Sequence, residues 1–562
     1  MDNQRLFTWG LVGLLFFMTW QAWQLDYNQP PPTRPETETI AEPGTTPLES
    51  AGDLPELHTA TAPATTPLPD AGPPETVYEA PEQQANLITV RTDVLEVEID
   101  TAGGDIVSAN VLKYPVAKDR PDEVVQLLSR IRGDYGVFRT GLRSGGDQPE
   151  PNHLATLTAE RSSYSLAEGE DSLEVPLFWQ RDDGLNVVKR YRFHPGSYRI
   201  ELEYDIDNRS DAPWRASSYA QIVKTALEPK RSMFNVDTYS FAGPVLYDGD
   251  KYEKYAIDDL RDDGPVRLNA INGWIAAIQH HFLVAAVPTD EKSYRYDLAL
   301  RDVRYTASMI GQPETIAANG KGKFGIILFV GPKLQAQLAE IAPNLKLTVD
   351  YGFLTILAQP LFWLLDKVHQ IVKNWGWSII IVTLLIKLVF YRLTAASGRS
   401  MAKMRNLQPR LKQIQDRYKD DRQKLSQAMM ELYKREKVNP AAGCLPILVQ
   451  MPFFLAFYWV LLESVEMRQA PFMLWINDLS VRDPFFVLPL LMGAAMFFQQ
   501  KLNPAPPDPV QARVMSILPV VFTVFFAFFP AGLVLYWFTN TLLSIAQQWR
   551  INKVVEQEAK KR

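Results

Sequence analysis

One lysine stands in a stretch of sequence that is otherwise almost entirely apolar. Lys387 lies within residues 379–390, where Thr383 is the only other residue that is not apolar. An ammonium group at the centre of a membrane-spanning helix costs about 2.5–3.5 kcal/mol, so such a residue usually faces a bundle interior or a watery cavity. Thr383 precedes it by one helical turn and shares its face. The pair could form a cationic site for an acidic or polar peptide.

A second interpretation of Lys387 requires no site. The residue stands five positions before Arg392, so its long side chain could extend to the membrane surface. This segment alone favours neither interpretation. Polar residues in the other apolar segments favour the first, because they predict a polar recess around the lysine. They are Gln450, Gln499, Gln500, Thr523, Thr539, Asn540 and Ser544. No Asp, Glu or His stands near the middle of these apolar segments, where the centre of the membrane would lie. This argues against a proton or ion pump.

A strongly basic segment follows the lysine. Residues 396–439 contain twelve Lys and Arg against five Asp and Glu. Apolar residues at helical spacing predict an αα-hairpin of two amphipathic helices. Its basic face could contact anionic lipid, ribosomal RNA or acidic peptide, although a solvated face that obeys the positive-inside rule explains most of the charge. The candidate contact residues are Met401, Lys403, Arg405, Arg410 and Lys412.

The sequence contains no evident catalytic or metal-binding constellation. Cys444 is the only cysteine, which excludes an intramolecular disulfide and zinc sites of the Cys₄ or Cys₂His₂ type. The globular half contains four histidines, and none has a carboxylate at a spacing typical of an acid–base pair. They are His153, His194, His280 and His281. On a strand the two neighbouring histidines would point to opposite faces. We expect a binding or scaffolding module there, and no enzyme. The net charge of -6 argues against a nucleic-acid binder, and DNA is not an expected partner.

Five membrane-spanning helices are expected to position the lysine. Their apolar runs are residues 377–393, 444–462, 485–498, 514–529 and 531–547. The last two are divided at Pro530 because the combined run is too long for one span. Residues 353–373 have helical spacing but contain charges and Pro360, which predicts an amphipathic helix in the membrane interface.

The N-terminal part predicts an anchor, a linker and a β domain. Residues 1–28 contain an uncharged run of 18 residues, and aromatic residues stand where a cleavage site would need small ones, which favours an anchor over a signal peptide. Residues 29–85 hold 13 of the 41 prolines and predict a disordered tether. Residues 86–345 contain short alternating runs between turn signals, which predict an all-β sandwich. These runs include Val94–Ile99, Val187–Phe193 and Arg199–Ile206.

The distribution of Lys and Arg predicts the orientation. Residues 396–439 and the basic tail 551–562 are expected in the cytoplasm, because Lys and Arg concentrate on that side of a membrane. With six spans, both termini would be cytoplasmic and the β domain would lie outside.

Several motifs resemble one known family. The run from Asn439 to Pro452, NPAAGCLPILVQMP, resembles the NP-x-x-GC-x-P-x-x-x-Q-x-P stretch of the YidC membrane-protein insertases. Residues 400–404 (SMAKM), 468–472 (RQAPF) and 529–537 (FPAGLVLYW) are also similar. The match is most specific from about residue 375 to 550. The overall plan is similar to that of the Gram-negative members over essentially the whole chain.

The resemblance implies a fold and a site. It implies a periplasmic β-supersandwich similar to sugar mutarotases but without their activity. It also implies a five-helix insertase core at residues 375–550, with a hydrophilic groove closed to the periplasm. The intramembrane arginine of the family falls on Lys387, which keeps the charge but lacks the planar fork of five donors. The other residues that the resemblance assigns to the groove or its edge are Thr383, Gln500, Tyr536 and Trp537.

The implied function is insertion, folding and assembly of nascent membrane proteins in the bacterial inner membrane. The implied partners are nascent membrane proteins, the lipid bilayer, the ribosome and the Sec translocon with its SecD and SecF subunits. Hydrophobic transfer would drive the process without a nucleotide, cofactor or metal. Two other classes remain open. A small-solute transporter would show internal repeats, and a tethered periplasmic carbohydrate enzyme would need only one anchor.

Overall fold

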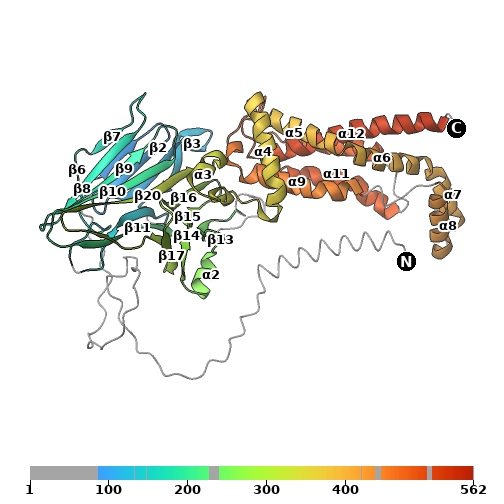
Figure 1. The fold of residues 1–562 in the computed structure, drawn as a ribbon. Coiled ribbons are helices and arrows are strands. Elements are labelled where there is room, and N and C mark those ends of the chain that lie inside the picture. Colours follow the sequence, from blue (N-terminus) through green and yellow to red (C-terminus); the bar gives the residue numbers. More distant parts are fainter. Residues whose placement is uncertain are drawn as a thin grey trace, which may run out of the picture.

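The structure is a computed structural model that describes residues 87–131, 133–146, 148–226, 240–418, 421–436, 445–502 and 509–560. It consists of a β domain at one end and a helical region at the other (Figure 1). The predicted anchor 1–28 and linker 29–85 lie outside the described residues, as does Cys444.

The β domain is built from 20 strands in the described part of the chain. They are β1 (Leu87–Arg91), β2 (Leu95–Asp100), β3 (Asp105–Ala117), β4 (Arg120–Leu128), β5 (Gly136–Arg143), β6 (Thr158–Ala159), β7 (Ser163–Ser165), β8 (Leu173–Gln180), β9 (Leu185–Phe193), β10 (Arg199–Asn208), β11 (Trp214–Thr225), β12 (Gly243–Tyr247), β13 (Tyr252–Lys254), β14 (Val266–Ile271), β15 (Trp274–Ile278), β16 (Phe282–Pro288), β17 (Ser293–Arg301), β18 (Arg304–Ile310), β19 (Glu314–Ile316) and β20 (Gly320–Pro332). One sheet has the order β14-β17-β18-β11-β5-β3-β2-β1-β7, with β19 on β11 and β4 on β3. The other has the order β13-β12-β15-β16-β20-β10-β9-β8-β6.

The alternating runs of the sequence form the predicted strands. Buried and half-buried residues alternate along the whole of β9 and β10. The two strands pair in antiparallel register from Ile200 opposite Phe193 to Asn208 opposite Leu185. Because successive side chains of a strand point to opposite faces, this period places one apolar face of each strand in the interior. The prediction of a β-rich domain is confirmed.

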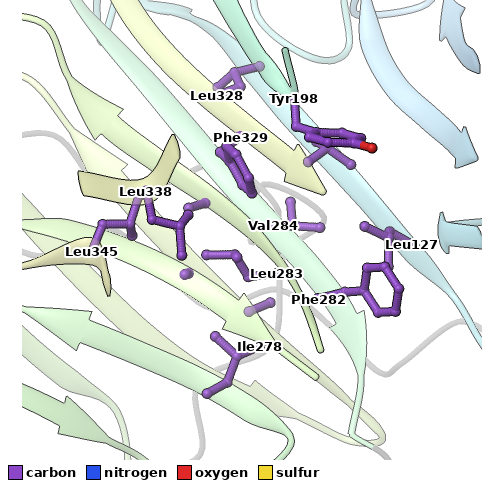
Figure 2. Packing of buried hydrophobic residues seen from close by; sticks show 14 of the residues in the cluster. Leu127, Tyr198, Ile278, Phe282, Leu283, Val284, Leu328, Phe329, Leu338 and Leu345 are labelled. Carbon is purple, nitrogen blue, oxygen red and sulfur yellow. The ribbon is translucent and has the colours of Figure 1, made fainter. Parts of the chain in front are cut away.

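The two sheets share one apolar core. Strand β11 of the first sheet contacts β15, β16 and β20 of the second. Figure 2 shows part of this core, where Phe282 and Leu283 on β16 and Phe329 on β20 belong to one cluster with Leu338 and Leu345. The last two residues come from helix α3 (Gln335–Ile341) and the 3₁₀ helix η3 (Leu345–Thr348). The segment that leaves the sandwich is therefore anchored in its core.

Trp274 is expected to be one of the largest single contributors to the stability of this domain. It is fully buried on β15, its ring stacks on Tyr247, and its Nε1–H donates to the carbonyl of Pro343 at 2.9 Å. Replacing a buried tryptophan by alanine costs about 3–5 kcal/mol. The Trp274→Ala change should therefore lower the thermal unfolding midpoint of the β domain by roughly 10 °C, followed by circular dichroism. Leu154→Ala, at a site that is 65% exposed, is the control, and an equal shift in both variants would contradict the assignment.

The prediction for the neighbouring histidines was wrong. His280 and His281 lie in the turn between β15 and β16, outside both strands. Their rings stack with centroids 3.7 Å apart. Alternation of side chains holds only within a strand, so in this turn both imidazoles reach the same neighbour, the end of a helix in the other half of the molecule.

The helical region contains nine α-helices among its described residues. They are α4 (Thr355–Val372), α5 (Trp375–Val389), α6 (Tyr391–Asn406), α7 (Gln408–Arg417), α8 (Arg422–Arg435), α9 (Leu445–Glu463), α10 (Val487–Leu502), α11 (Pro509–Phe526) and α12 (Ala531–Lys560). Helix α12 contacts α5, α6, α9 and α10 and is the centre of the assembly. Helix α4 packs on α5 and α9 through Ala358, Leu361 and Leu365 and leaves Ile356, Trp363 and Ile371 exposed, as an amphipathic helix would.

The first predicted span is divided between two helices. Within the described residues no single helix is both long and apolar enough to cross a membrane; α5 and α6 meet these criteria only together, with a bend of 70° between them. The predicted span 377–393 is therefore not one straight helix. No proline or glycine stands at the bend, but the Thr394 hydroxyl donates to the carbonyl of Phe390 at 3.0 Å, and such back-bonding often bends a helix. The count of six spans stays a prediction.

Two further predicted boundaries differ in the structure. The first hairpin helix is divided, because α6 ends at Asn406 and α7 begins at Gln408 with a proline in its first turn. Met401, Lys403 and Arg405 thus lie on α6, and only Arg410 and Lys412 lie on α7. The expected separate tail, 551–562, continues α12 as far as Lys560. Ile551 and Val555 hold it there by packing against Ala395 and Ala402 of α6.

Candidate functional site around Lys387

Lys387 lies in the last turn of α5 and points toward α12. Its Nζ donates to the Ser544 hydroxyl at 2.7 Å, and that hydroxyl donates to the carbonyl of Asn540 at 2.7 Å. A cation in the last turn of a helix also interacts favourably with the helix dipole. The lysine is therefore held inside the bundle by a neutral hydroxyl.

A narrow pocket surrounds this lysine. Its volume is about 30 Å³, which is room for little more than one water molecule. Its lining residues come from α5, α6, α9 and α12, and they are Thr383, Ile386, Lys387, Phe390, Leu393, Thr394, Gln450, Phe453, Tyr536 and Asn540. None of these lining residues is acidic. Six of the ten lining side chains carry a polar or charged group. The pocket as it stands is too small for a peptide, so entry of one requires the helices to separate.

Three of the five predicted groove residues meet at this pocket. Thr383 and Tyr536 line it together with Lys387. Trp537 does not; its ring packs against Phe454 and Phe526 with centroids 4.5 and 5.2 Å away. Gln500 is half-buried in the last turn of α10 and is also absent from the lining.

The polar recess predicted around the lysine is present in reduced form. Gln450 and Asn540 line the pocket and Ser544 binds the lysine, whereas Gln499 and Thr523 are not among the lining residues. Thr394 lines the pocket and was not predicted. It stands two helical turns after Lys387, a spacing that could have revealed it if the helix had been straight.

The opposite end of α5 is closed by the loop after α9. The Asn374 side chain accepts from the backbone N–H of Trp377 at 3.1 Å and donates to the carbonyl of Phe472 at 2.9 Å. A Cβ on Gly376 would lie 2.0 Å from the ring of Phe472, so only glycine permits this approach. The loop therefore packs directly on the start of α5.

The histidines of the β domain do not gather into a site. The imidazole of His153 contacts the Tyr219 hydroxyl at 2.7 Å, and that of His194 contacts the carbonyl of Asp171 at 3.1 Å. His280 and His281 lie in a third place, at the helical region. The described residues contain no group of three or more His, Cys, Asp or Glu that could hold a metal ion.

Comparison with known proteins places both halves of the chain in one class. The sequence model of the YidC periplasmic domain family matches residues 87–364. The sequence model of the 60Kd inner membrane protein family matches residues 367–559. The chain is 47% identical over 571 residues to the membrane protein insertase YidC of Thioalkalivibrio sulfidiphilus, with 100% of each chain covered. It is 46% identical over 572 residues to that of Nitrosococcus oceani, with 99% of this chain and 100% of the relative covered. A crystal structure of an active YidC insertase with its first transmembrane domain resolved covers 82% of this chain and 93% of its own, at 20% identity and a TM-score of 0.38.

These matches define an inner membrane protein that carries a periplasmic domain. The chain belongs to the YidC family of membrane protein insertases. It is a non-enzymatic insertase whose clients are nascent membrane proteins, and its β domain is the periplasmic domain.

Proposed function

We propose that the Lys387 pocket is where a client first engages the insertase. A polar or acidic segment of the nascent chain then displaces the Ser544 hydroxyl from the lysine and binds it through a carboxylate. The observation that carries this proposal is a cation inside the bundle, held by Ser544 at 2.7 Å, in a pocket whose lining contains no acid. A charge-assisted bond to a carboxylate is roughly twice as strong as a neutral one, so a client can compete for the lysine.

Apolar transfer then completes the insertion. The client's hydrophobic segment leaves the pocket between α5 and α10 and enters lipid, which releases about 25 cal/mol for each Å² of apolar surface removed from water. The outward faces of these two helices support this path, because Leu388, Val389, Leu490 and Phe498 are exposed. Of the five groove residues proposed, Gln500 lies on α10 beside this path, whereas Trp537 packs against α9 and α11.

The proposed arrangement in the membrane has six spans and a periplasmic β-supersandwich. Both termini are cytoplasmic, and the helical core comprises residues 375–550 with the cytoplasmic segment 396–439. Helix α4 lies in the outer interface, which its three exposed apolar residues support. The loop that covers Gly376 closes the groove toward the periplasm.

The partners proposed are the ribosome and the Sec translocon with SecD and SecF. The hairpin of α7 and α8 receives clients from the ribosome. Its apolar side is closed by Leu407, Leu411, Leu432 and Tyr433, which leaves the basic side free to face a partner. Arg410 on that side is paired with Glu436 at 2.8 Å, whereas Lys403 and Arg405 extend the basic surface along α6.

Reconstitution tests the proposal. The purified protein in liposomes, without other proteins, should insert a short client with an acidic N-terminal tail, measured by protection of the tail from added protease. Liposomes that lack the protein give the spontaneous background. Insertion that stays at background, or that needs an added nucleotide, would contradict the proposed mechanism.

A further inference from the structure

The periplasmic domain and the helical region meet at the end of α9. This helix ends at Glu463, and the last four carbonyls of a helix have no partner within it. One of these, the carbonyl of Leu462, accepts from Nε2 of His280 at 3.0 Å and from Nε2 of His281 at 3.1 Å. Because a carbonyl only accepts, both rings carry their proton on Nε2. The periplasmic domain thus caps α9 with two donors.

Opposite charges are buried at the same place. Lys333, which follows β20, and Glu463 are 1% and 2% exposed. Burial lowers the pKa of Lys333 to about 8, and the negative charge of Glu463 acts against this shift. The Glu463 carboxylate also accepts from the Ser240 hydroxyl at 2.7 Å and lies 4.0 Å from Nε2 of His280. Glu463 therefore depends on the periplasmic domain for compensation, and Lys333 depends chiefly on Glu463, with a smaller contribution from Asp350.

The loop after α9 is held by further contacts with the periplasmic domain. The hydroxyl of Tyr351 lies 3.2 Å from that of Ser464, and both residues are buried. Farther along the loop, Nη2 of Arg468 donates to the carbonyl of Pro115 at 2.9 Å, and Nε2 of Gln469 donates to the same carbonyl at 2.8 Å. The end of α9 is thus fixed to β3 and to the segments after β15 and β20.

Helix α9 connects this interface with the pocket. Gln450 and Phe453 line the pocket, and Glu463 lies 13 residues after Gln450, which is about 20 Å along a helix. Between them, Phe457 stacks on Tyr536 with ring centroids 4.5 Å apart. A shift or tilt at the Glu463 end is therefore transmitted to one wall of the pocket.

We propose that the periplasmic domain positions α9 through a buried polar latch, and that this latch sets the spacing between the α9 wall and the Lys387 wall of the pocket. The α9 latch consists of Ser240, His280, His281, Lys333 and Tyr351 on one side and Leu462, Glu463 and Ser464 on the other. The inference rests on the proposed role of the pocket as the client site. It assigns Lys333 and Glu463 as positioning residues for insertion.

Substitution tests the latch more cleanly than acidification does. Burial lowers the pKa of His280 from its usual value of 6.5 to about 4. The docked interface therefore favours the neutral imidazole, and a fall in pH below about 6.5 weakens docking. Burial also raises the pKa of Glu466, beside Gln335, to about 7, so protonation of this carboxyl strengthens docking. Lys333, Glu463 and Arg468 face the same interface. The opposing signs prevent a simple dependence on pH.

The experiment uses the full-length protein with Cys444→Ala and Ser464→Cys, which leaves one buried thiol in the latch. A membrane-impermeant maleimide labels this thiol only when the interface opens, so the labelling rate reports the open population. Lys333→Met and Glu463→Gln should each raise the rate by roughly 30-fold or more, because an unpaired buried charge remains. The double variant removes both charges and should return to within about fivefold of the parent. Lys323→Met, which breaks an exposed pair with Glu203, is the matched control.

Insertion is measured on the same proteins. Both single variants should insert clients more slowly, and the double variant should recover. Glu463 lies outside the sandwich, so Glu463→Gln should not affect the folding of the β domain. Its labelling rate therefore tests the latch even if Lys333→Met does not fold. Unchanged labelling in Glu463→Gln would overturn the latch, and raised labelling with unchanged insertion would overturn its positioning role. Lys387→Glu separates this inference from the proposed function, because it should reduce insertion by about tenfold or more and leave labelling at the parent rate.

Discussion

Reversing the charge of Lys387 is expected to reduce insertion of a client with an acidic tail by about tenfold or more. Like charges about 4 Å apart near a protein surface repel by roughly 4 kcal/mol, and about 1.4 kcal/mol already corresponds to a factor of ten. Lys387→Glu places such a repulsion where the structure has a cation bound to a hydroxyl. The measurement is the initial rate of tail protection in liposomes.

Two further variants make this result specific to the site. Lys387→Arg keeps the charge and should retain most of the activity, because the proposed engagement needs a positive charge and no particular fork of donors. Lys367→Glu makes the same change of charge on the exposed side of α4, outside the pocket, and should have little effect. If Lys387→Glu inserts clients as fast as the parent, the proposed attraction between the lysine and the client is wrong.

Removing the cytoplasmic hairpin is expected to reduce insertion of ribosome-bound clients several-fold. Residues 405–435 contain α7 and α8, which pack on each other through a cluster of their own. Figure 1 shows that both helices lie at the end of the helical region far from the β domain, set off from the other helices. Their deletion, with a short Gly/Ser linker between α6 and α9, therefore leaves the pocket and the central helix intact. The readout is insertion during translation in the presence of vesicles.

The same deletion should have a smaller effect on clients that are released from the ribosome before they are added. A matched variant, Arg410→Gln with Lys412→Gln, keeps the hairpin but removes charge from its basic side. If full activity persists without residues 405–435, the hairpin has no role in delivery. If the deletion unfolds the protein, its thermal midpoint will fall, whereas that of the charge variant will not.

Local patterns were sufficient for much of the fold. The period of two in β9 and β10 and the apolar spacing of α4 lie within single elements, so the sequence reveals them directly. The charge at Lys387 was also visible, because a lone lysine in an apolar run needs an explanation wherever the helix lies. Thr383 and Tyr536 were assigned to the same site by family resemblance and line the pocket.

Other features depend on contacts between distant segments. The capping of Leu462 by two histidines joins residues about 180 positions apart, and no local period encodes such a pairing. The bend at Phe390 arises without proline or glycine, and it moves Lys387 from the middle of an expected span to the end of α5. Trp537 stands next to a pocket residue, but the neighbouring position on a helix faces about 100° away, toward the aromatic cluster of α9 and α11.

Reversing the charge on the client, on the insertase, or on both tests the central claim most directly. Two clients that differ only in an acidic or a basic N-terminal tail are inserted by the parent and by Lys387→Glu. If the lysine engages the tail through its charge, the ratio of acidic-tail to basic-tail insertion should fall by at least about tenfold in the variant. Equal ratios in the two proteins would contradict the account, because they would show that the charge at position 387 does not select the client.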